Sequence, residues 1–240
     1  MSKMIVEVWS DVMCPFCFIG KRNYEKALSQ FKHASNVELV WKSFQLDPTI
    51  PTENITKSHY EFLAEKKGWT VSHCKELHKS LLVTGKKAGI DFNFDIVRDT
   101  NSFNTHRVLQ LAQEKGLGNH AEEIFFKAFF QDGKNLNDRS DLFSVAKEVG
   151  LTEAETEKAL TDDKYAAAVK ADIREATRYG VQGVPFFVFD KKYAVSGAQE
   201  PVSFLRTLEK SYTEWKNENS ENNLQSVSDG PACTPDGVCK

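Results

Sequence analysis

Two cysteines three residues apart are the residues in this chain most able to do chemistry. Cys14 and Cys17 enclose Pro15 and Phe16, and the segment that follows them has the composition of a helix. The N-terminal end of a helix carries roughly half a positive charge, which favours the thiolate form of the first cysteine. The second cysteine lies one turn on, where it can attack a mixed disulfide and release the product. The motif therefore predicts a redox-active dithiol, with Cys14 as the exposed nucleophile and Cys17 as the resolving thiol.

A zinc half-site is the alternative for the same pair. Zinc wants four ligands in a tetrahedron, and the second half would have to come from Cys233 and Cys239. Those two cysteines have five residues between them and stand on a tail, which suits zinc poorly. An inert, packed pair is a third interpretation. We favour the dithiol and expect no metal ion and no cofactor.

The composition limits the classes of function. Hydrophobic residues make up 40% and charged residues 27% of the 240 residues, which is ordinary for a globular protein with a sizeable core. The net charge of −3 gives no electrostatic reason to bind nucleic acid or an anionic membrane. We find no signal-peptide pattern and no apolar run of about 20 residues. A cytoplasmic location is therefore expected, where cysteine pairs are more often catalytic, redox-sensing or metal-binding than structural.

The first part of the chain predicts a β-α-β unit. Residues 4–9 form an apolar run of strand length, and residues 37–44 are rich in β-branched and aromatic side chains. Between them, the apolar residues of segment 18–31 recur at positions i, i+3, i+4 and i+7, the spacing of one helix face. Such a unit normally places its two strands parallel in one sheet.

About 130 residues of helical character follow this unit. Thr152 with Glu155 fits a capping box, and Gly116, Gly150 and Gly180 stand where helices should end. The segments with helical periodicity or composition are 58–67, 71–88, 104–115, 121–131, 141–149, 153–160 and 163–179.

The strand pattern returns after this helical block. Residues 185–189 and 193–196 are separated by a short hairpin connection, and a last helix spans about 201–216. The order predicts an α/β protein with a four-stranded thioredoxin-like fold, interrupted by a large inserted all-helical domain. Two independent domains are the weaker alternative, because neither pair of strands can bury its faces without the other pair.

The predicted boundaries follow from this order. A discontinuous thioredoxin-like domain takes residues 1–48 and 180–216, and the inserted helical domain takes residues 49–179. Residues 217–240 are rich in Asn, Ser, Glu and Gly and are predicted to form a flexible tail. Within the insertion, the alternating segment 90–94 is expected to be extended and to pack on the sheet.

A proline stands at the start of the third predicted strand. Proline cannot donate a ladder hydrogen bond, so Pro185 needs a special position there. In thioredoxin-like proteins a cis proline at this place faces the cysteine pair. The backbone of the residue before it, Val184 in this chain, is then free to hold an extended substrate. An ordinary trans proline at a sheet edge is the alternative.

Two titratable side chains are candidates to assist thiol exchange. Glu7 lies in the first predicted strand, where a carboxylate buried near the cysteines would accept and relay a proton. An exposed glutamate on an edge strand is equally compatible with the sequence. His106 would reach the active-site cleft from the helical block and stabilise a thiolate, or it is a packed or solvated helix residue. Lys21 and Arg22 are expected to be solvated and to add positive potential.

A second cysteine pair lies near the C-terminus. Cys233 and Cys239 enclose a Pro-Asp-Gly turn sequence, and about 16 tail residues precede them. A flexible coil of that length spans about 20–25 Å, enough to visit Cys14 and Cys17. We hypothesise an intramolecular electron shuttle, with an idle oxidisable tail or a weak metal clip as alternatives. Cys74 has no partner in sequence and is expected to be a buried free thiol.

Four stretches of the sequence resemble a known family. They are residues 10–22, which include the Cys-Pro-Phe-Cys motif, and residues 104–107, 180–187 and 193–199. All four are similar to stretches of the DsbA-like FrnE proteins, and the likeness covers residues 4 to about 215 in order. The resemblance implies a thioredoxin fold interrupted by a helical domain, and the activity of a disulfide oxidoreductase or isomerase. Some members are similar in having a C-terminal cysteine pair.

The partners that this resemblance implies are protein or peptide thiols and disulfides and low-molecular-weight thiols, with glutathione as a candidate redox partner. A related branch contains glutathione-dependent kappa-class transferases and hydroxychromene-carboxylate isomerases, which usually have serine at the nucleophile position. Cys14 together with Cys17 argues for dithiol exchange over that small-molecule chemistry. A non-catalytic, redox-sensing partner of another enzyme is the third class of function.

Overall fold

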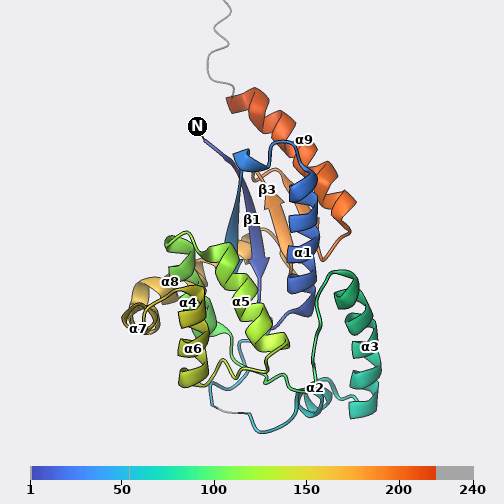
Figure 1. Cartoon of the computed structure of the whole chain (residues 1–240), viewed down its shortest axis with the longest axis vertical. Helices are drawn as coiled ribbons and strands as arrows, with labels where there is room; N and C mark the ends of the chain where they lie inside the picture. The colour runs from blue at the N-terminus through green and yellow to red at the C-terminus, as the bar shows by residue number, and fades with distance from the viewer. Residues whose placement is uncertain (1, 54, 220–240) are drawn as a thin grey trace, which may run out of the picture.

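The computed structural model describes residues 2–53 and 55–219, and a four-stranded mixed sheet lies at its centre (Figure 1). β1 runs parallel to β2 and antiparallel to β3, and β3 runs antiparallel to β4. Helix α1 (Pro15–Gln30) is the crossover between the two parallel strands, as in the predicted β-α-β unit. In their order across the sheet, the strands are β2 (Val37–Ser43), β1 (Met4–Ser10), β3 (Phe186–Phe189) and β4 (Tyr193–Ser196).

Seven helices of the described chain lie between β2 and β3 in sequence. They are α2 (His59–Lys67), α3 (Val71–Lys87), α4 (Phe103–Glu114), α5 (Gly118–Phe130), α6 (Arg139–Val149), α7 (Glu153–Thr161) and α8 (Asp163–Arg178). The last helix, α9 (Pro201–Asn219), continues three residues past its predicted end. The predicted fold class is therefore confirmed: a thioredoxin-like sheet whose second and third strands are separated by a helical block. Within the described residues, no helix has the length and apolarity needed to cross a membrane.

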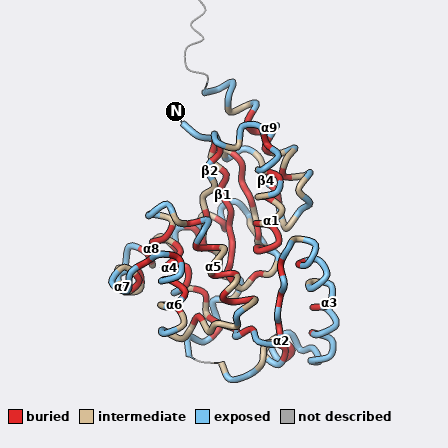
Figure 2. Tube along the Cα trace, viewed as in Figure 1, coloured by how far each residue is buried: buried red, intermediate tan, exposed pale blue. Residues whose placement is uncertain are grey.

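The two faces of the sheet are covered by different helices. Val6 and Val8 of β1 pack with Tyr24 of α1 and Phe204 of α9, in a cluster that is buried throughout. Trp9, one residue on, points to the opposite face, where its indole Nε1 donates to the Asp172 carbonyl of α8 at 2.9 Å. The alternation of side chains along a strand thus assigns α1 and α9 to one face and α8 to the other. Figure 2 shows the burial that results along β1 and the inner side of α1.

A second apolar cluster lies in the helical block and reaches the cysteine pair. Phe18 of α1 stacks on Phe126 of α5 with ring centroids 5.0 Å apart, and Cys14 and Cys17 belong to the same buried cluster. The turn that carries the cysteines is therefore built where the sheet domain and the helical block meet.

The prediction for residues 90–94 is wrong in its location. Ile90, Phe92 and Phe94 are buried in this second cluster and not on the sheet. The segment forms no strand, and the Asn93 N–H donates to the last carbonyl of α5 at 2.9 Å. The ring of Phe92 packs onto Gly85 of α3, where an added Cβ would come within 2.4 Å of that ring.

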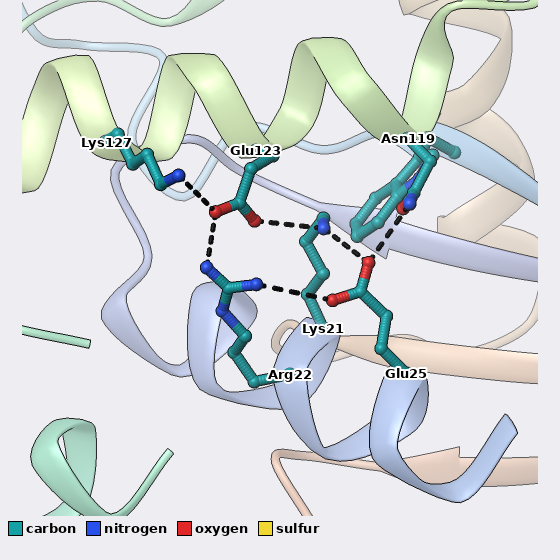
Figure 3. A network of polar contacts seen from close by, with 7 residues as sticks. Lys21, Arg22, Glu25, Asn119, Glu123 and Lys127 are labelled. Atoms are coloured by element: carbon teal, nitrogen blue, oxygen red, sulfur yellow. Dashed lines mark hydrogen bonds and ion pairs between the residues drawn. The ribbon is translucent and has the colours of Figure 1, made fainter. Parts of the chain in front are cut away.

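A network of charged side chains fastens α1 to α5 (Figure 3). The ammonium of Lys21 lies 2.6 Å from Glu25 and 3.0 Å from Glu123, and Arg22 also pairs with Glu123. Lys127, one turn along α5, approaches Glu123 at 3.1 Å. Lys21 is 2% exposed, so the expectation that it is solvated is wrong. A buried ammonium is stable only with its counter-charges in place, and Glu123 therefore ties the helical block to the active-site helix.

We expect the Glu123→Gln substitution to lower the free energy of unfolding by about 1–3 kcal/mol, because Lys21 stays buried with only one carboxylate left. Urea unfolding followed by circular dichroism measures this change. The matched control is Glu114→Gln, which removes an exposed ion pair to Lys164 and should change stability far less. Equal losses in the two variants would contradict a stabilising role for the buried pair.

Candidate active site

The two cysteines stand at the first turn of α1. Cys14 is the N-cap residue with an extended backbone, and Pro15 occupies the first helical position, where a missing N–H costs nothing. The Cys17 N–H donates to the Cys14 carbonyl at 3.0 Å. The helix thus begins three residues earlier than predicted, and Cys17 lies inside it. Because the sulfurs belong to an N-cap residue and a first-turn residue, they differ in environment.

Both thiols are free and buried within the described part of the chain. Cys14 is 4% exposed and Cys17 is 1% exposed, while Phe16 between them is 48% exposed. The expectation of an exposed Cys14 is therefore wrong, because the turn packs against the apolar cluster of the helical block and against the segment before β3. Phe16 is the residue of the motif that faces solvent.

The segment before β3 lies over the first cysteine. The Val184–Pro185 peptide bond is cis, and the Cys14 thiol donates to the Val184 carbonyl with a sulfur–oxygen distance of 3.4 Å. Gly20 of α1 permits this approach, since an added Cβ there would lie 2.8 Å from the Pro185 ring. The Pro185 carbonyl accepts from the Gly197 N–H at 2.8 Å, which anchors the segment to the end of β4.

Asp11 holds the turn from behind. Its carboxylate accepts from the Leu46 N–H at 2.8 Å and from the Met13 N–H at 3.3 Å, and its backbone carbonyl accepts from the Cys14 N–H at 2.9 Å. The Nε2 atom of His106, from α4, lies 3.6 Å from the same carboxylate. Asp11 has no exposed surface. One buried carboxylate therefore fixes the loop before Cys14, the loop after β2 and a helix of the insertion.

His106 supplies the counter-charge to Asp11. Burial by itself would lower the pKa of His106, but the Asp11 carboxylate outweighs burial, with a smaller contribution from Glu122, and the pKa is raised. The imidazolium form is thus favoured next to Asp11. Among the described residues, His106 forms no hydrogen bond with either sulfur; it faces Asp11, which holds the turn, and it is therefore a positioning residue.

Glu122 of α5 completes this buried cluster. Burial, with a smaller contribution from Asp11, raises the pKa of Glu122 to about 7, against the charges of His106 and Lys21. Its Oε2 atom has no hydrogen-bond partner among the described residues. The carboxyl group is therefore near its titration midpoint at neutral pH, which makes the cluster behind the turn sensitive to pH.

The surroundings of Cys17 strongly favour its protonated thiol over the thiolate. Burial raises its pKa well above the ordinary value, and the neighbouring Cys14 adds to the effect, against smaller opposing contributions from the Asp11 backbone and the Ser10 hydroxyl. Cys17 therefore keeps its proton at neutral pH. This is the state that a resolving thiol needs while a mixed disulfide forms on its neighbour.

The structure does not bring Glu7 to the cysteines. Glu7 is buried on the face of the sheet covered by α8, where its carboxylate lies 3.4 Å from the ammonium of Lys42. Lys42 also contacts Asp172 at 3.2 Å and Glu175 at 2.9 Å. Both faces of β1 are buried, and alternation places Glu7 with Trp9 on the face opposite α1. The proposed relay through Glu7 is therefore corrected to a structural ion pair.

Two residues of the site escaped the sequence analysis. Asp11 had a usable signal, since it lies in the short turn between a strand and the motif. Glu122 had none, because Glu122 and Glu123 are identical neighbours in a helix and only the packing of α5 decides which is buried. Cys233 and Cys239 lie outside the described residues. Among those described, no group of three or more His, Cys, Asp or Glu side chains is arranged to hold a metal ion.

We expect Glu122→Gln to change the pH dependence of stability. A carboxyl whose pKa is higher in the folded than in the unfolded protein stabilises the fold at low pH, and this contribution is lost as the pH rises from about 4.5 to about 7. The variant should lack that loss, which corresponds to roughly 1–3 kcal/mol of relative stability gained between pH 4.5 and pH 8. Urea unfolding at a series of pH values measures it.

The control for this prediction is Glu148→Gln, at an exposed position on α6. Its stability profile should run parallel to that of the unmodified protein. A parallel profile for Glu122→Gln as well would show that Glu122 ionises with an ordinary carboxyl pKa.

The comparison with known proteins agrees with this geometry. The family described as the DSBA-like thioredoxin domain matches residues 5–209. A crystal structure of a probable DsbA oxidoreductase from Streptomyces coelicolor is 34% identical, with a TM-score of 0.82 over 99% of this chain and 98% of that chain.

Two more distant structures share the fold. The cytosolic disulfide reductase DsbM from Pseudomonas aeruginosa, solved with GSH, has a TM-score of 0.63 at 18% identity, covering 87% of this chain and 99% of that chain. A 2-hydroxychromene-2-carboxylate isomerase has a TM-score of 0.61 at 16% identity, covering 91% and 98%. The family match spans most of the chain, and it coincides with a cysteine pair at a helix start opposite a cis proline. The chain therefore belongs to the family of DSBA-like thioredoxin domains, and it is a disulfide oxidoreductase of the DsbA-like type.

Proposed function

We propose that the protein exchanges disulfides with thiol substrates through the Cys14–Cys17 dithiol. The observation that carries the proposal is the placement of Cys14 at the N-cap of α1, with its sulfur 3.4 Å from the carbonyl that precedes the cis proline. Cys17 stands within the same helical turn as a protonated, buried thiol. This pairing of a sulfur at the helix N-cap with a protonated sulfur inside the first turn suits sequential attack and release.

The exchange proceeds in two steps when the reduced protein meets a disulfide. The Cys14 thiolate attacks one substrate sulfur, the substrate S–S bond breaks, and the second sulfur leaves as a thiolate. Cys17 then attacks Cys14, a Cys14–Cys17 disulfide forms, and the bound substrate sulfur departs with the proton that Cys17 gives up. Two electrons pass from the dithiol to the substrate, and the reverse sequence oxidises a substrate dithiol.

The surroundings of the cysteines have proposed roles in holding the substrate. The Val184 carbonyl, which the Cys14 thiol occupies in the free protein, would accept a backbone N–H of an extended substrate once Cys14 is in a mixed disulfide. Pro185 fixes the direction of that carbonyl, and the exposed ring of Phe16 offers an apolar contact. Protein and peptide disulfides and low-molecular-weight thiols are the proposed partners. The cytoplasm, as for the similar DsbM, is the proposed location.

We expect Cys14→Ser to abolish dithiol activity, because no other described cysteine stands at a helix N-cap. Cys17→Ser should still attack substrates but accumulate the mixed disulfide on Cys14, since the resolving thiol is missing. Insulin reduction and refolding of a scrambled disulfide protein measure activity, and intact-mass spectrometry detects the trapped adduct. Cys74→Ser, at a buried free thiol in α3, is the matched control and should retain activity.

The results that would reject the proposal are equally specific. Activity retained by Cys14→Ser would rule out this nucleophile. Binding of glutathione with turnover of an aromatic substrate, and no exchange with any disulfide, would favour the alternative of a glutathione-dependent isomerase.

We propose in addition that Cys233 and Cys239 exchange electrons with the Cys14–Cys17 pair. Helix α9 ends at the opposite end of the sheet from the start of α1 (Figure 1). The 14 residues from Asn219 to Cys233 reach at most about 50 Å when fully extended. In the exchange, the tail dithiol would reduce the Cys14–Cys17 disulfide and become a disulfide itself, with two electrons transferred.

Removal of residues 220–240 tests this shuttle. We expect steady-state turnover with protein substrates to fall in the truncated protein. The rate of a single turnover, in which pre-reduced Cys14 reacts once with a disulfide, should stay the same. The double substitution Cys233→Ser and Cys239→Ser is the matched control, because it keeps the tail and removes only its sulfurs. Unchanged turnover in both variants would exclude the shuttle.

A further inference from the structure

Two histidines of the helical insertion turn the same ring nitrogen toward each other. His59 is the first residue of α2, His78 lies in α3, and their Nε2 atoms are 3.2 Å apart. The His59 side chain is 14% exposed, and His78 is buried. Two imidazoles that face each other in this way form either a hydrogen bond or a pair of metal ligands, and their surroundings favour one of these.

The partners of the Nδ1 atoms assign the protons of both rings. The Nδ1 of His59 lies 3.0 and 3.1 Å from the two oxygens of Asp99, and the Nδ1 of His78 lies 2.7 Å from the Cys74 carbonyl. A carboxylate and a carbonyl only accept, so both Nδ1 atoms carry hydrogen. In the neutral rings each Nε2 then presents a lone pair to the other. Two lone pairs repel each other at this distance unless a cation, a proton or a metal ion, lies between them.

The separation of the two nitrogens suits a metal ion. Two nitrogen ligands of a tetrahedral zinc ion, each about 2.0–2.1 Å from the metal, lie about 3.3–3.4 Å apart. The distance between the Nε2 atoms of His59 and His78 is close to this value. For a hydrogen bond donated by an N–H group, the same distance is at the long end of the usual range.

The second contacts of the two rings are those of metal-binding histidines. A histidine that ligates a metal almost always donates its other ring N–H to a carboxylate, a backbone carbonyl or water. His59 has the carboxylate of Asp99 and His78 has the carbonyl of Cys74. Phe94 holds the ring planes, because it stacks on His59 with centroids 5.9 Å apart and meets His78 edge-on at 4.4 Å. Both imidazoles are therefore fixed in tautomer and in orientation.

An ion can reach the two nitrogens through a pocket of about 310 Å³, which both histidines and Asp99 line. Asp99 supplies negative charge behind His59. Of the two lysines that border the pocket, Lys66 is paired with Asp47 and Lys67 is exposed to solvent. The described residues place no third His, Cys, Asp or Glu side chain around the same point, so water or a ligand in the pocket would complete the coordination.

We infer that His59 and His78 form a binding site for a divalent transition-metal ion of the zinc type, with Asp99 as a positioning residue behind His59. Imidazole nitrogen suits such ions, whereas Mg²⁺ and Ca²⁺ prefer oxygen ligands. The bound ion joins α2 to α3, and its binding stabilises the folded protein. The site uses neither Cys14 nor Cys17, so the inference is independent of the proposed dithiol exchange.

The test measures zinc binding by the full-length chain without competing thiolates. The background protein carries four substitutions: Cys14→Ser, Cys17→Ser, Cys233→Ser and Cys239→Ser. Zn²⁺ is titrated into it at neutral pH in competition with a chromophoric chelator. We expect one zinc ion to bind per chain and Mg²⁺ not to displace it. Zinc should also raise the Tm of the background protein, because the ion binds only the folded form.

Single substitutions in this background assign the ligands. His59→Gln and His78→Gln should each weaken zinc binding by about 100-fold or more, and Asp99→Asn by about 10–100-fold, as the loss of a second contact of a ligating histidine does. His73→Gln is the matched control, because it removes an exposed histidine of the same helix α3 and should leave the affinity unchanged. Circular dichroism reports that each variant is folded.

X-ray absorption of the zinc-loaded background protein identifies the ligands without any change to the histidines. We expect two imidazole nitrogens at about 2.0–2.1 Å and no sulfur at about 2.3 Å from the metal. A sulfur ligand would assign the zinc to Cys74, the cysteine that the background retains, and would overturn the histidine site.

Two further results would overturn it. A background protein that binds no zinc would show that the cation between the two rings is a proton. Zinc binding of equal affinity in the background and in a folded His78→Gln variant would place the ion elsewhere. Neither result affects the proposed disulfide exchange, because that activity is measured separately on the protein with all its cysteines.

Discussion

The buried carboxylate of Asp11 is the interaction on which the rest of the site depends. It accepts hydrogen bonds from backbone N–H groups in two loops, the one that follows β1 and the one that follows β2. It also faces the imidazole of His106 at 3.6 Å. A carboxylate removed from water is stable only when hydrogen bonds and a counter-charge replace its hydration. Part of that replacement comes from α4, inside the helical insertion. The cysteine turn of the thioredoxin-like sheet is therefore not complete without the insertion.

The same dependence recurs on the other side of α1. Lys21 is buried one turn after Cys17, and its carboxylate partner Glu123 belongs to α5. Phe18, which lies between Cys17 and Lys21 in sequence, stacks on Phe126 of α5. Charged and apolar contacts thus bind the first two turns of α1 to α5, and both cysteines lie within or next to these turns. The insertion serves as the second wall of the site and not as an appendage to the sheet.

Local patterns predicted the elements well, because the signals that end and begin helices act over a few residues. The capping box of Thr152 with Glu155 and the left-handed Gly150 are both present where the sequence placed them. These local signals could not predict which side chains of distant elements come into contact. Glu7 was misplaced because both faces of β1 are buried, so burial could not reveal which face it takes. Glu122 and Glu123 differ in environment because adjacent helix positions point about 100° apart, which only the packing of α5 resolves.

The division of labour between the two cysteines follows from where α1 begins. With Pro15 at the first helical position, Cys14 stays outside the helix at its positive end and Cys17 is carried into the first turn, while both sulfurs lie in the same buried cluster. A helix that began at residue 18 would leave both sulfurs ahead of the first turn, in similar surroundings. Proline decides between these alternatives, because its fixed φ suits the first helical position and its missing N–H is not needed there. The contrast between a sulfur at the helix N-cap and a sulfur inside the first turn therefore traces to the proline that follows the first cysteine.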